Sequence, residues 1–205
     1  MKTNITLDVR GFLKIYDPNT GEVFEEKNNA INYETMSQSL ALTLSDRGYG
    51  QIYQMAFGNG AASIDSTGLI TYLPPNVSGI NASLYNQTYE KIVDDTLISN
   101  SDPLNNNMTV NHVVGTMYTD ILVKCLLNYG EPSGQMAFDN GTQSDNTYTF
   151  DELGLLANYG LDQEGNIQTV LLTHVVFAPI QKALNRQIQI DYTVRIQALT
   201  NLITI

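Results

Sequence analysis

The chain contains little charge, no tryptophan and a single cysteine. Only 15% of its 205 residues are charged, compared with about 25% in typical soluble domains. The lone cysteine, Cys125, excludes an intrachain disulfide, and its neighbours in DILVKCLLNYG indicate a buried, inert thiol. Asn, Gln, Ser, Thr and Tyr replace the missing charges. They predict a neutral, hydrogen-bonding surface that is cheap to desolvate in protein–protein contacts.

Basic residues are particularly scarce. Ten Lys and Arg stand against 21 Asp and Glu, which gives a net charge of −11. This balance argues against a nucleic-acid-binding surface, because neutralising phosphates requires clustered basic side chains. No segment approaches the ~20 apolar residues of a membrane span, and the N-terminal MKTNITLDVRG lacks the apolar run of a signal peptide. We therefore expect no membrane partner and assembly in a cytoplasm.

Alternating side chains predict a β-rich fold. Residues 188–197 place Ile188, Ile190, Tyr192 and their alternating neighbours on one face, with polar residues on the other. Residues 6–16 and 22–27 flank a turn and predict a hairpin. Further strands are expected in the following ranges: 51–57, 108–127, 167–178 and 187–197.

One segment has helical periodicity. Met36, Leu40 and Leu44 recur every four residues within about 33–46, and Asn32 is placed to cap the N-terminus. We predict a mainly β fold with one domain over residues 1–205. It is an antiparallel β-sandwich-like domain with this one amphipathic helix and long loops.

Long loops and an apolar tail are the candidate contact regions. Residues 61–107 form a loop-rich insertion, and 128–147 form a polar loop. Residues 198–205 form an apolar tail that either docks on its own domain or inserts into a neighbouring chain. The candidate assembly contacts are Tyr72, Tyr85, Tyr89, Leu199, Leu202, Ile203 and Ile205.

Candidate reactive groups are sparse. The loop that starts Gly58-Asn59-Gly60 follows a strand but lacks the Lys-Ser/Thr ending of a phosphate-binding loop, so a turn is favoured. Asp151 and Glu152 are adjacent and should face opposite sides of a strand, so they make no acid/base pair. Glu152 is expected at a strand edge, capping backbone amides or pairing with Lys182.

No metal or cofactor site is predicted. His112 and His174 are expected to be half-buried sheet residues with hydrogen-bond partners, and no other ligand is spaced to complete a site. Asp139, Asn140 and Asp145 do not match the spacing of a calcium loop. The sequence therefore indicates no catalytic, cofactor-binding or metal-binding residues, and we predict a protein that is not an enzyme.

The order of several segments resembles structural proteins of tailed bacteriophages. These segments are Asp151-Glu152-Leu153-Gly154-Leu155, a following strand with the step Pro179-x-x-Lys182, and the alternating terminal strand. The opening GFLKIYDPNTGEVFEEKNNAI at 11–31 and the passage ETMSQSLALTLSDRGYGQIYQMAFGNG at 34–60 extend the pattern. The resemblance implies a virion component of the neck, collar, tail or fibre-attachment region.

That resemblance sets the functional expectations. The protein is expected to act without catalysis, through homo-oligomeric assembly and adhesion to other virion proteins. A capsid decoration protein is one alternative. A receptor- or glycan-binding module that stacks sugar rings on Tyr72, Tyr85 and Tyr89 is an alternative of another class.

Overall fold

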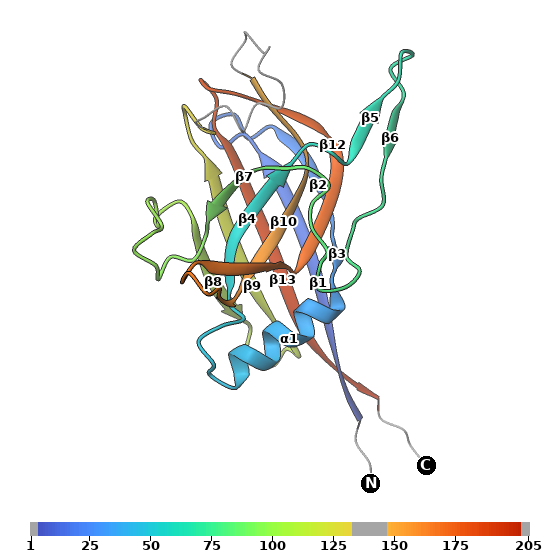
Figure 1. Ribbon diagram of the computed structural model, residues 1–205. Helices are drawn as coiled ribbons and strands as arrows, with labels where there is room; N and C mark the ends of the chain where they lie inside the picture. The colour runs from blue at the N-terminus through green and yellow to red at the C-terminus, as the bar shows by residue number, and fades with distance from the viewer. Residues whose placement is uncertain (1–3, 133–146, 202–205) are drawn as a thin grey trace.

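The chain folds into two antiparallel sheets that pack face to face (Figure 1). A computed structural model describes residues 4–132 and 147–201. The five-stranded sheet has the order β2-β1-β13-β9-β8. Its strands are β1 (Asn4–Tyr16), β2 (Val23–Asn28), β8 (Asn107–His112), β9 (Tyr118–Leu127) and β13 (Ile188–Asn201). The predicted hairpin of residues 6–16 and 22–27 is confirmed as β1 and β2.

The six-stranded sheet forms the second layer. Its order is β3-β12-β10-β4-β7, and β11 pairs with β10 away from this path. The strands are β3 (Ala30–Ile31), β4 (Ile52–Gly58), β7 (Gln87–Ile92), β10 (Thr147–Leu161), β11 (Ile167–Leu171) and β12 (Thr173–Ala183). A separate hairpin joins β5 (Ala62–Ile64) to β6 (Ile70–Tyr72). The predicted mainly β, sandwich-like fold is confirmed.

The core lies between the two sheets. On β13 the predicted inward residues Ile188, Ile190, Tyr192 and Val194 are all buried, so the period of two is confirmed there. The facing sheet contributes an aromatic cluster of Phe57, Tyr148, Phe150 and Phe177, each essentially inaccessible to solvent. Apolar burial across this interface is the main stabilising contribution to the fold.

Strand β10 changes its alternation part-way along. Tyr148 and Phe150 face the core, and then Leu153 and Leu155 do so. The pairing with β12 shifts register between Phe150 and Glu152, which marks a β-bulge. Two consecutive residues, Asp151 and Glu152, therefore lie between inward-facing positions.

The predicted helix is confirmed as α1 (Tyr33–Leu44). The Asn32 side chain caps it by accepting a hydrogen bond from the Thr35 backbone N–H. The helix ends at Leu44, earlier than the expected residue 46, and Asp46 then takes a left-handed φ of 52°. Met36 is buried and Leu40 half-buried, whereas Leu44 is 84% exposed because the chain turns away from the sandwich.

Part of the insertion at 61–107 covers the outer face of the six-stranded sheet. Ala82 and Leu84 pack with Ala56, Leu156 and Leu171 in a second apolar cluster on the outer face of the six-stranded sheet. The insertion also contains the three short strands β5, β6 and β7. The segment around Ala82 and Leu84 therefore packs on the six-stranded sheet of its own domain.

Two strand boundaries differ from the sequence-based expectation. The strand expected at 167–178 is divided into β11 and β12 at Leu172. Both parts pair with β10, and the Leu172 N–H still donates to the Leu155 carbonyl. The strand expected to end at 197 continues to Asn201, since β1 pairs with it along its whole length. Residues 198–201 of the expected apolar tail are therefore part of β13.

Candidate functional site

The five-stranded sheet carries apolar side chains beyond the region that the other layer covers. On its inner face, Leu7 of β1 lies opposite Ala198 of β13, and Ile121 of β9 lies opposite Val110 of β8. Leu7 is 58% exposed and Val110 is 68% exposed. The inner face thus continues from the closed core toward an open end of the sandwich.

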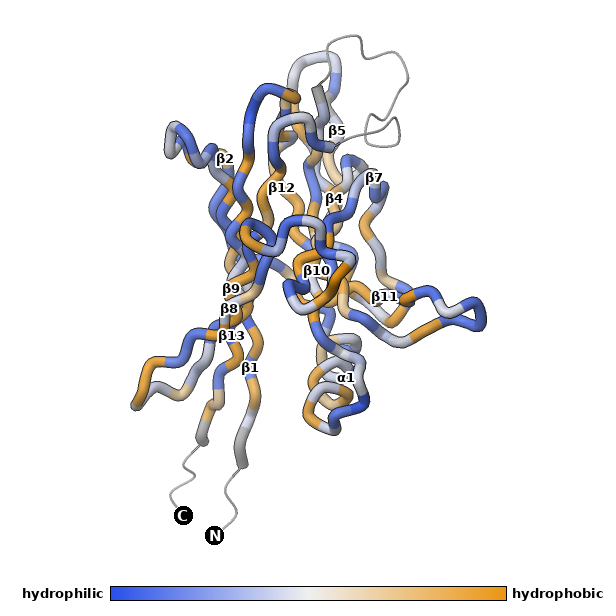
Figure 2. The backbone as a smooth tube through the Cα atoms, turned by 90° about the vertical axis from the view of Figure 1, so that its left-hand side faces the viewer, coloured by the Kyte–Doolittle hydropathy of each residue, from blue (hydrophilic) through white to orange (hydrophobic). Residues whose placement is uncertain are grey.

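Several further apolar side chains lie at this same end. The turn between β8 and β9 carries Val113, Val114 and Met117, all exposed, and the Ala198 N–H donates to the Met117 carbonyl. Figure 2 shows the apolar tip of this hairpin beside the projecting ends of β1 and β13. We call the following residues the open-end surface: Leu7, Val110, Val113, Val114, Met117 and Leu199.

An apolar groove of about 300 Å³ leads from the open end toward the core, between α1 and the five-stranded sheet. Met36, Leu40 and Thr43 line its helix side. Burial along its sheet side decreases across the sheet toward the edge strand β8. Val194 on β13 is 2% exposed, its neighbour Ile121 on β9 is half-buried, and Val110 on β8, at the mouth, is 68% exposed.

Among the described residues, no charged side chain lines the groove, and two of its polar groups already have partners. Ser39 Oγ donates to the Gly50 carbonyl, and Thr43 Oγ1 donates to the Ser39 carbonyl. The lining is therefore suited to an aliphatic occupant without charge. Nothing in it is arranged for acid–base or nucleophilic chemistry.

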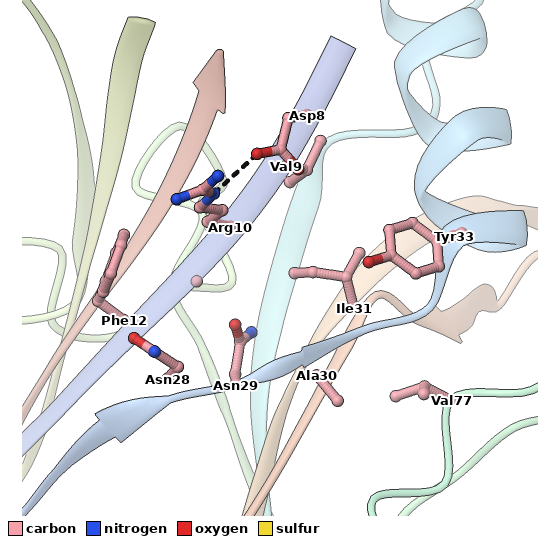
Figure 3. Close-up of a pocket in the computed structure, with 11 residues that line it drawn as sticks. Asp8, Val9, Arg10, Phe12, Asn28, Asn29, Ala30, Ile31, Tyr33 and Val77 are labelled. Atoms are coloured by element: carbon pink, nitrogen blue, oxygen red, sulfur yellow. Dashed lines mark hydrogen bonds and ion pairs between the residues drawn. The ribbon is translucent and has the colours of Figure 1, made fainter. Parts of the chain in front are cut away.

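A second hollow, of about 490 Å³, lies beside β1 where β2 ends and the chain crosses to β3 (Figure 3). Pairing of β1 with β2 begins at Phe12, so no described strand pairs with this edge of β1 before that residue. Arg10 Nε contacts Asp8 Oδ2 at 2.7 Å on this edge. Exposed ion pairs of this kind contribute little stability.

The most buried polar cluster surrounds Glu152, at the bulge of β10. Its Oε1 accepts hydrogen bonds from the backbone N–H groups of Gly60 at 3.2 Å and Asn86 at 2.8 Å. Its Oε2 accepts from the Tyr85 N–H and from His174 Nε2, both at 2.9 Å. Burial tends to raise the pKa of Glu152, but these hydrogen bonds outweigh it and hold the pKa below its usual value.

The neighbouring groups fix the charge state of this cluster. His174 Nδ1 accepts the Asn76 N–H at 2.8 Å, so Nε2 carries the proton and the imidazole is neutral. Asp151 accepts the N–H groups of Ala61 and Ala62 at 3.1 and 2.9 Å. Burial raises the pKa of Asp151, and these two amides offset part of that rise.

This cluster is an anchor and has no free group for catalysis. Because of the bulge, Asp151 and Glu152 both reach the loop at 58–62, which corrects the expectation that they face opposite sides. The loop's amides, the donors that a phosphate would need, are directed at the protein's own carboxylates. The expected turn at Gly58-Asn59-Gly60 is therefore fixed to β10 by the hydrogen bond from the Gly60 N–H to Glu152.

Glu152 lies between β4 and β12 and not at an edge, and it pairs with His174 and not with Lys182. Lys182 instead donates to the carbonyls of Asn128, Glu131 and Ala183, at 2.8 to 3.0 Å. Burial lowers the pKa of Lys182 to about 8, although the nearby Glu131 opposes this. The capping of backbone amides by Glu152 is as expected.

The two histidines lie in different environments. His174 is fully buried and His112 is exposed on β8, so neither is half-buried as expected. His112 Nδ1 lies 3.0 Å from Thr119 Oγ1. Within residues 4–132 and 147–201, no three His, Cys, Asp or Glu side chains gather as a metal site would require. Asp139, Asn140 and Asp145 lie outside the described residues.

The predicted contact tyrosines do not share one environment. Tyr72 on β6 and Tyr85 in the following loop are 47% and 40% exposed. The Tyr85 hydroxyl donates to the Pro74 carbonyl, and its ring lies against His174. Tyr89 on β7 packs against Phe57 and Tyr148, so little of its ring remains for a partner.

The predicted tail contacts divide between described and undescribed residues. Leu199 lies on β13 and is 37% exposed at the open end. Leu202, Ile203 and Ile205 lie outside the described residues. Sequence patterns missed Val110 on β8, and Val114 and Met117 in the turn that follows. Neither the alternation of a short strand nor the composition of a turn shows whether another layer covers these side chains.

Cys125 provides a direct test of core closure. It is fully buried on β9 opposite Ile190, and burial raises its pKa from 9.0 to about 12. The unfolded thiol loses its proton above about pH 9 while the folded one keeps it, so its contribution to stability declines between pH 9 and 12. Cys125→Ala should reduce this pH dependence of the unfolding free energy.

The native thiol should also resist alkylation until the protein unfolds. A maleimide added to the folded protein at neutral pH is expected to leave Cys125 unmodified, with rapid labelling in urea as the control. Native labelling at the unfolded rate would contradict the buried position.

Along the described stretches 4–132 and 147–201, no helix has the length and apolar character needed to cross a bilayer. Comparisons with known proteins identify no relative. No family model matches the chain, and no curated protein or solved structure matches it significantly.

Proposed function

We propose that this protein is a non-enzymatic structural component of a tailed-phage virion. It belongs to the neck or collar, tail or fibre-attachment region and works through homo-oligomeric assembly and adhesion to other virion proteins. The observation that carries the assembly part is the open-end surface with its groove. Several exposed apolar side chains gathered at one end of a sheet, next to an apolar groove, are typical of a surface that is covered by protein. The virion part rests on the resemblance described above.

The composition supports the same proposal. A neutral, hydrogen-bonding surface with few ions loses little solvation when subunits pack. Asp151 and Glu152 are buried carboxylates, and both accept hydrogen bonds from the protein itself. The donors are backbone amides and, for Glu152, His174. The role of these two carboxylates is to keep the insertion rigid on the sandwich, which suits a part that acts by shape.

The assembly proposal is tested by native mass measured across a wide concentration range. The wild-type protein should form a closed oligomer, and Met117→Asp should dissociate it, because a buried carboxylate at a subunit contact costs several kcal/mol. Val23→Asp is the matched control. Val23 is 46% exposed on β2, toward the end of β1 that lies away from Leu7, and its change should leave the mass unaltered.

A monomer at every concentration would contradict self-assembly. Equal effects of the two substitutions would place the contact elsewhere. The virion proposal predicts in addition that purified phage particles contain the chain at a fixed copy number, as measured by quantitative peptide mass spectrometry. Its absence from particles would overturn that proposal while leaving the oligomer in place.

A further inference from the structure

The apolar groove between α1 and the five-stranded sheet needs an occupant. Its wall runs from buried Val194 to exposed Val110 without a charged side chain, so a continuous apolar surface is left open to solvent. Leaving such a surface in water is unfavourable in proportion to its area. A segment that fills it should be aliphatic, uncharged and narrow enough to lie between a helix and a sheet.

Residues 202–205 have this chemistry. They read Leu-Ile-Thr-Ile and carry no charge. They follow Asn201, which pairs with Asn4 at the far end of the ribbon formed by β1 and β13. Figure 1 shows this ribbon projecting from the sandwich beyond α1. The ribbon therefore ends away from the sandwich at Asn201, directly before these residues in the chain.

These four residues cannot fill their own groove. Ile196, at the groove wall, precedes Asn201 by five positions in a continuous strand. At about 3.3 Å per residue that separation is about 17 Å, whereas four extended residues span at most about 14 Å. Even a segment that reversed sharply after Asn201 would reach no further than the outer wall at Ile196. It would stop well short of Val194, which lies seven positions, or about 23 Å, before Asn201.

We propose that residues 202–205 of a second copy of this chain occupy the groove. This inference depends on the proposed self-assembly and names its contact. The projecting ribbon carries the segment out to the neighbour, and the absence of charge on both sides makes the two surfaces compatible. Exchange of identical segments between protomers is an established route to closed oligomers.

The experiment is disulfide trapping between two differently sized copies. One copy carries Ile203→Cys and a longer affinity tag, and the other carries Val110→Cys at the groove mouth. After mixing and mild oxidation, a covalent heterodimer is expected, because a disulfide forms only when the two Cα atoms approach within about 7 Å. Cys125 is fully buried and can remain in both copies. The wild-type chain alone should form no cross-link.

Val114→Cys is the matched control. Val114 is 93% exposed, more than Val110 at 68%, but it lies on the turn outside the groove. It should cross-link to Ile203→Cys far less than Val110→Cys does. Independently, Ile203→Asp should raise the concentration at which the oligomer dissociates on the order of tenfold to a hundredfold, as expected from losing one buried aliphatic side chain.

The outcomes separate this inference from the proposed function. An oligomer that forms without the Val110–Ile203 cross-link and withstands Ile203→Asp would overturn the inference and leave self-assembly standing. An intrachain cross-link in the Val110→Cys/Ile203→Cys double variant would show the segment in its own groove and would also overturn it. A small apolar molecule retained in the groove in native mass spectrometry would do the same. A wild-type monomer at all concentrations would remove both proposals.

Discussion

Glu152→Gln should be among the most destabilising isosteric substitutions in this chain. Each oxygen of Glu152 accepts two hydrogen bonds: Oε1 from the Gly60 and Asn86 amides, Oε2 from the Tyr85 amide and His174. Glutamine replaces one of these oxygens with an NH₂ group. Whichever way it is oriented, two buried donors then face another donor and lose their acceptor.

The expected loss is about 3–5 kcal/mol of unfolding free energy, the usual cost of leaving buried charged or polar groups without partners. Urea denaturation measures it as a lower midpoint with an unchanged slope. Glu164→Gln in the exposed β10–β11 turn is the matched control and should change stability by less than about 0.5 kcal/mol. Equal stability of the two variants would refute the anchoring role of Glu152.

The same carboxylate predicts part of the acid sensitivity. Hydrogen bonds hold the pKa of Glu152 below its unfolded value, despite burial. The stability that Glu152 contributes is therefore fully present above its unfolded pKa of 4.5 and is lost as the pH falls through the lower folded value. The difference in unfolding free energy between wild type and Glu152→Gln should consequently shrink on acidification below pH 4.5. A constant difference would contradict this linkage.

Phe150→Ala should cost a comparable amount by a different mechanism. The Phe150 ring is fully buried, lies edge-on to Phe57 and Phe177 at centroid distances of 5.5 and 5.7 Å, and stacks on Tyr148 at 5.6 Å. These four rings come from three strands. The three remaining rings therefore cannot move into the cavity left by Phe150 unless the strands themselves shift. A loss of about 3–5 kcal/mol is expected for such a truncation.

Phe12→Ala is the control for this substitution. Phe12 is 39% exposed, and it contacts Arg195 on the outer face of the five-stranded sheet. Its removal creates no closed cavity and should cost about 1 kcal/mol or less. Thermal or urea unfolding of both variants distinguishes the two positions. A Phe12→Ala loss as large as that of Phe150→Ala would mean that the outer face is packed in solution.

The cluster around Glu152 and the open end of the sandwich have different roles. The cluster around Glu152 fixes the loops at 58–62 and 76–86 against the six-stranded sheet. The open end, by contrast, leaves Leu7, Val110 and Met117 exposed. A domain that is rigid at one position and incompletely covered at another is suited to assembly, since rigid parts lose little entropy when they associate.

Local patterns in the sequence determined most of the strands, the helix and its cap. The alternation over 188–197, the turn between β1 and β2, and the capping Asn32 depend on neighbours within a few residues, which the sequence displays directly. Burial of Cys125 also followed from its apolar neighbours. The fold class could therefore be predicted without knowing which strands pair.

The tertiary structure alone decided which side chains meet. The bulge at Asp151–Glu152, the pairing of Glu152 with His174 and the extension of β13 to Asn201 depend on partners 22 to 197 residues away in the chain. A period of two predicts a face but not what covers it, so the exposed inner face at Val110 could not be found from the sequence. Covering a face is a property of two sheets packed together, and only their three-dimensional arrangement shows where one extends beyond the other.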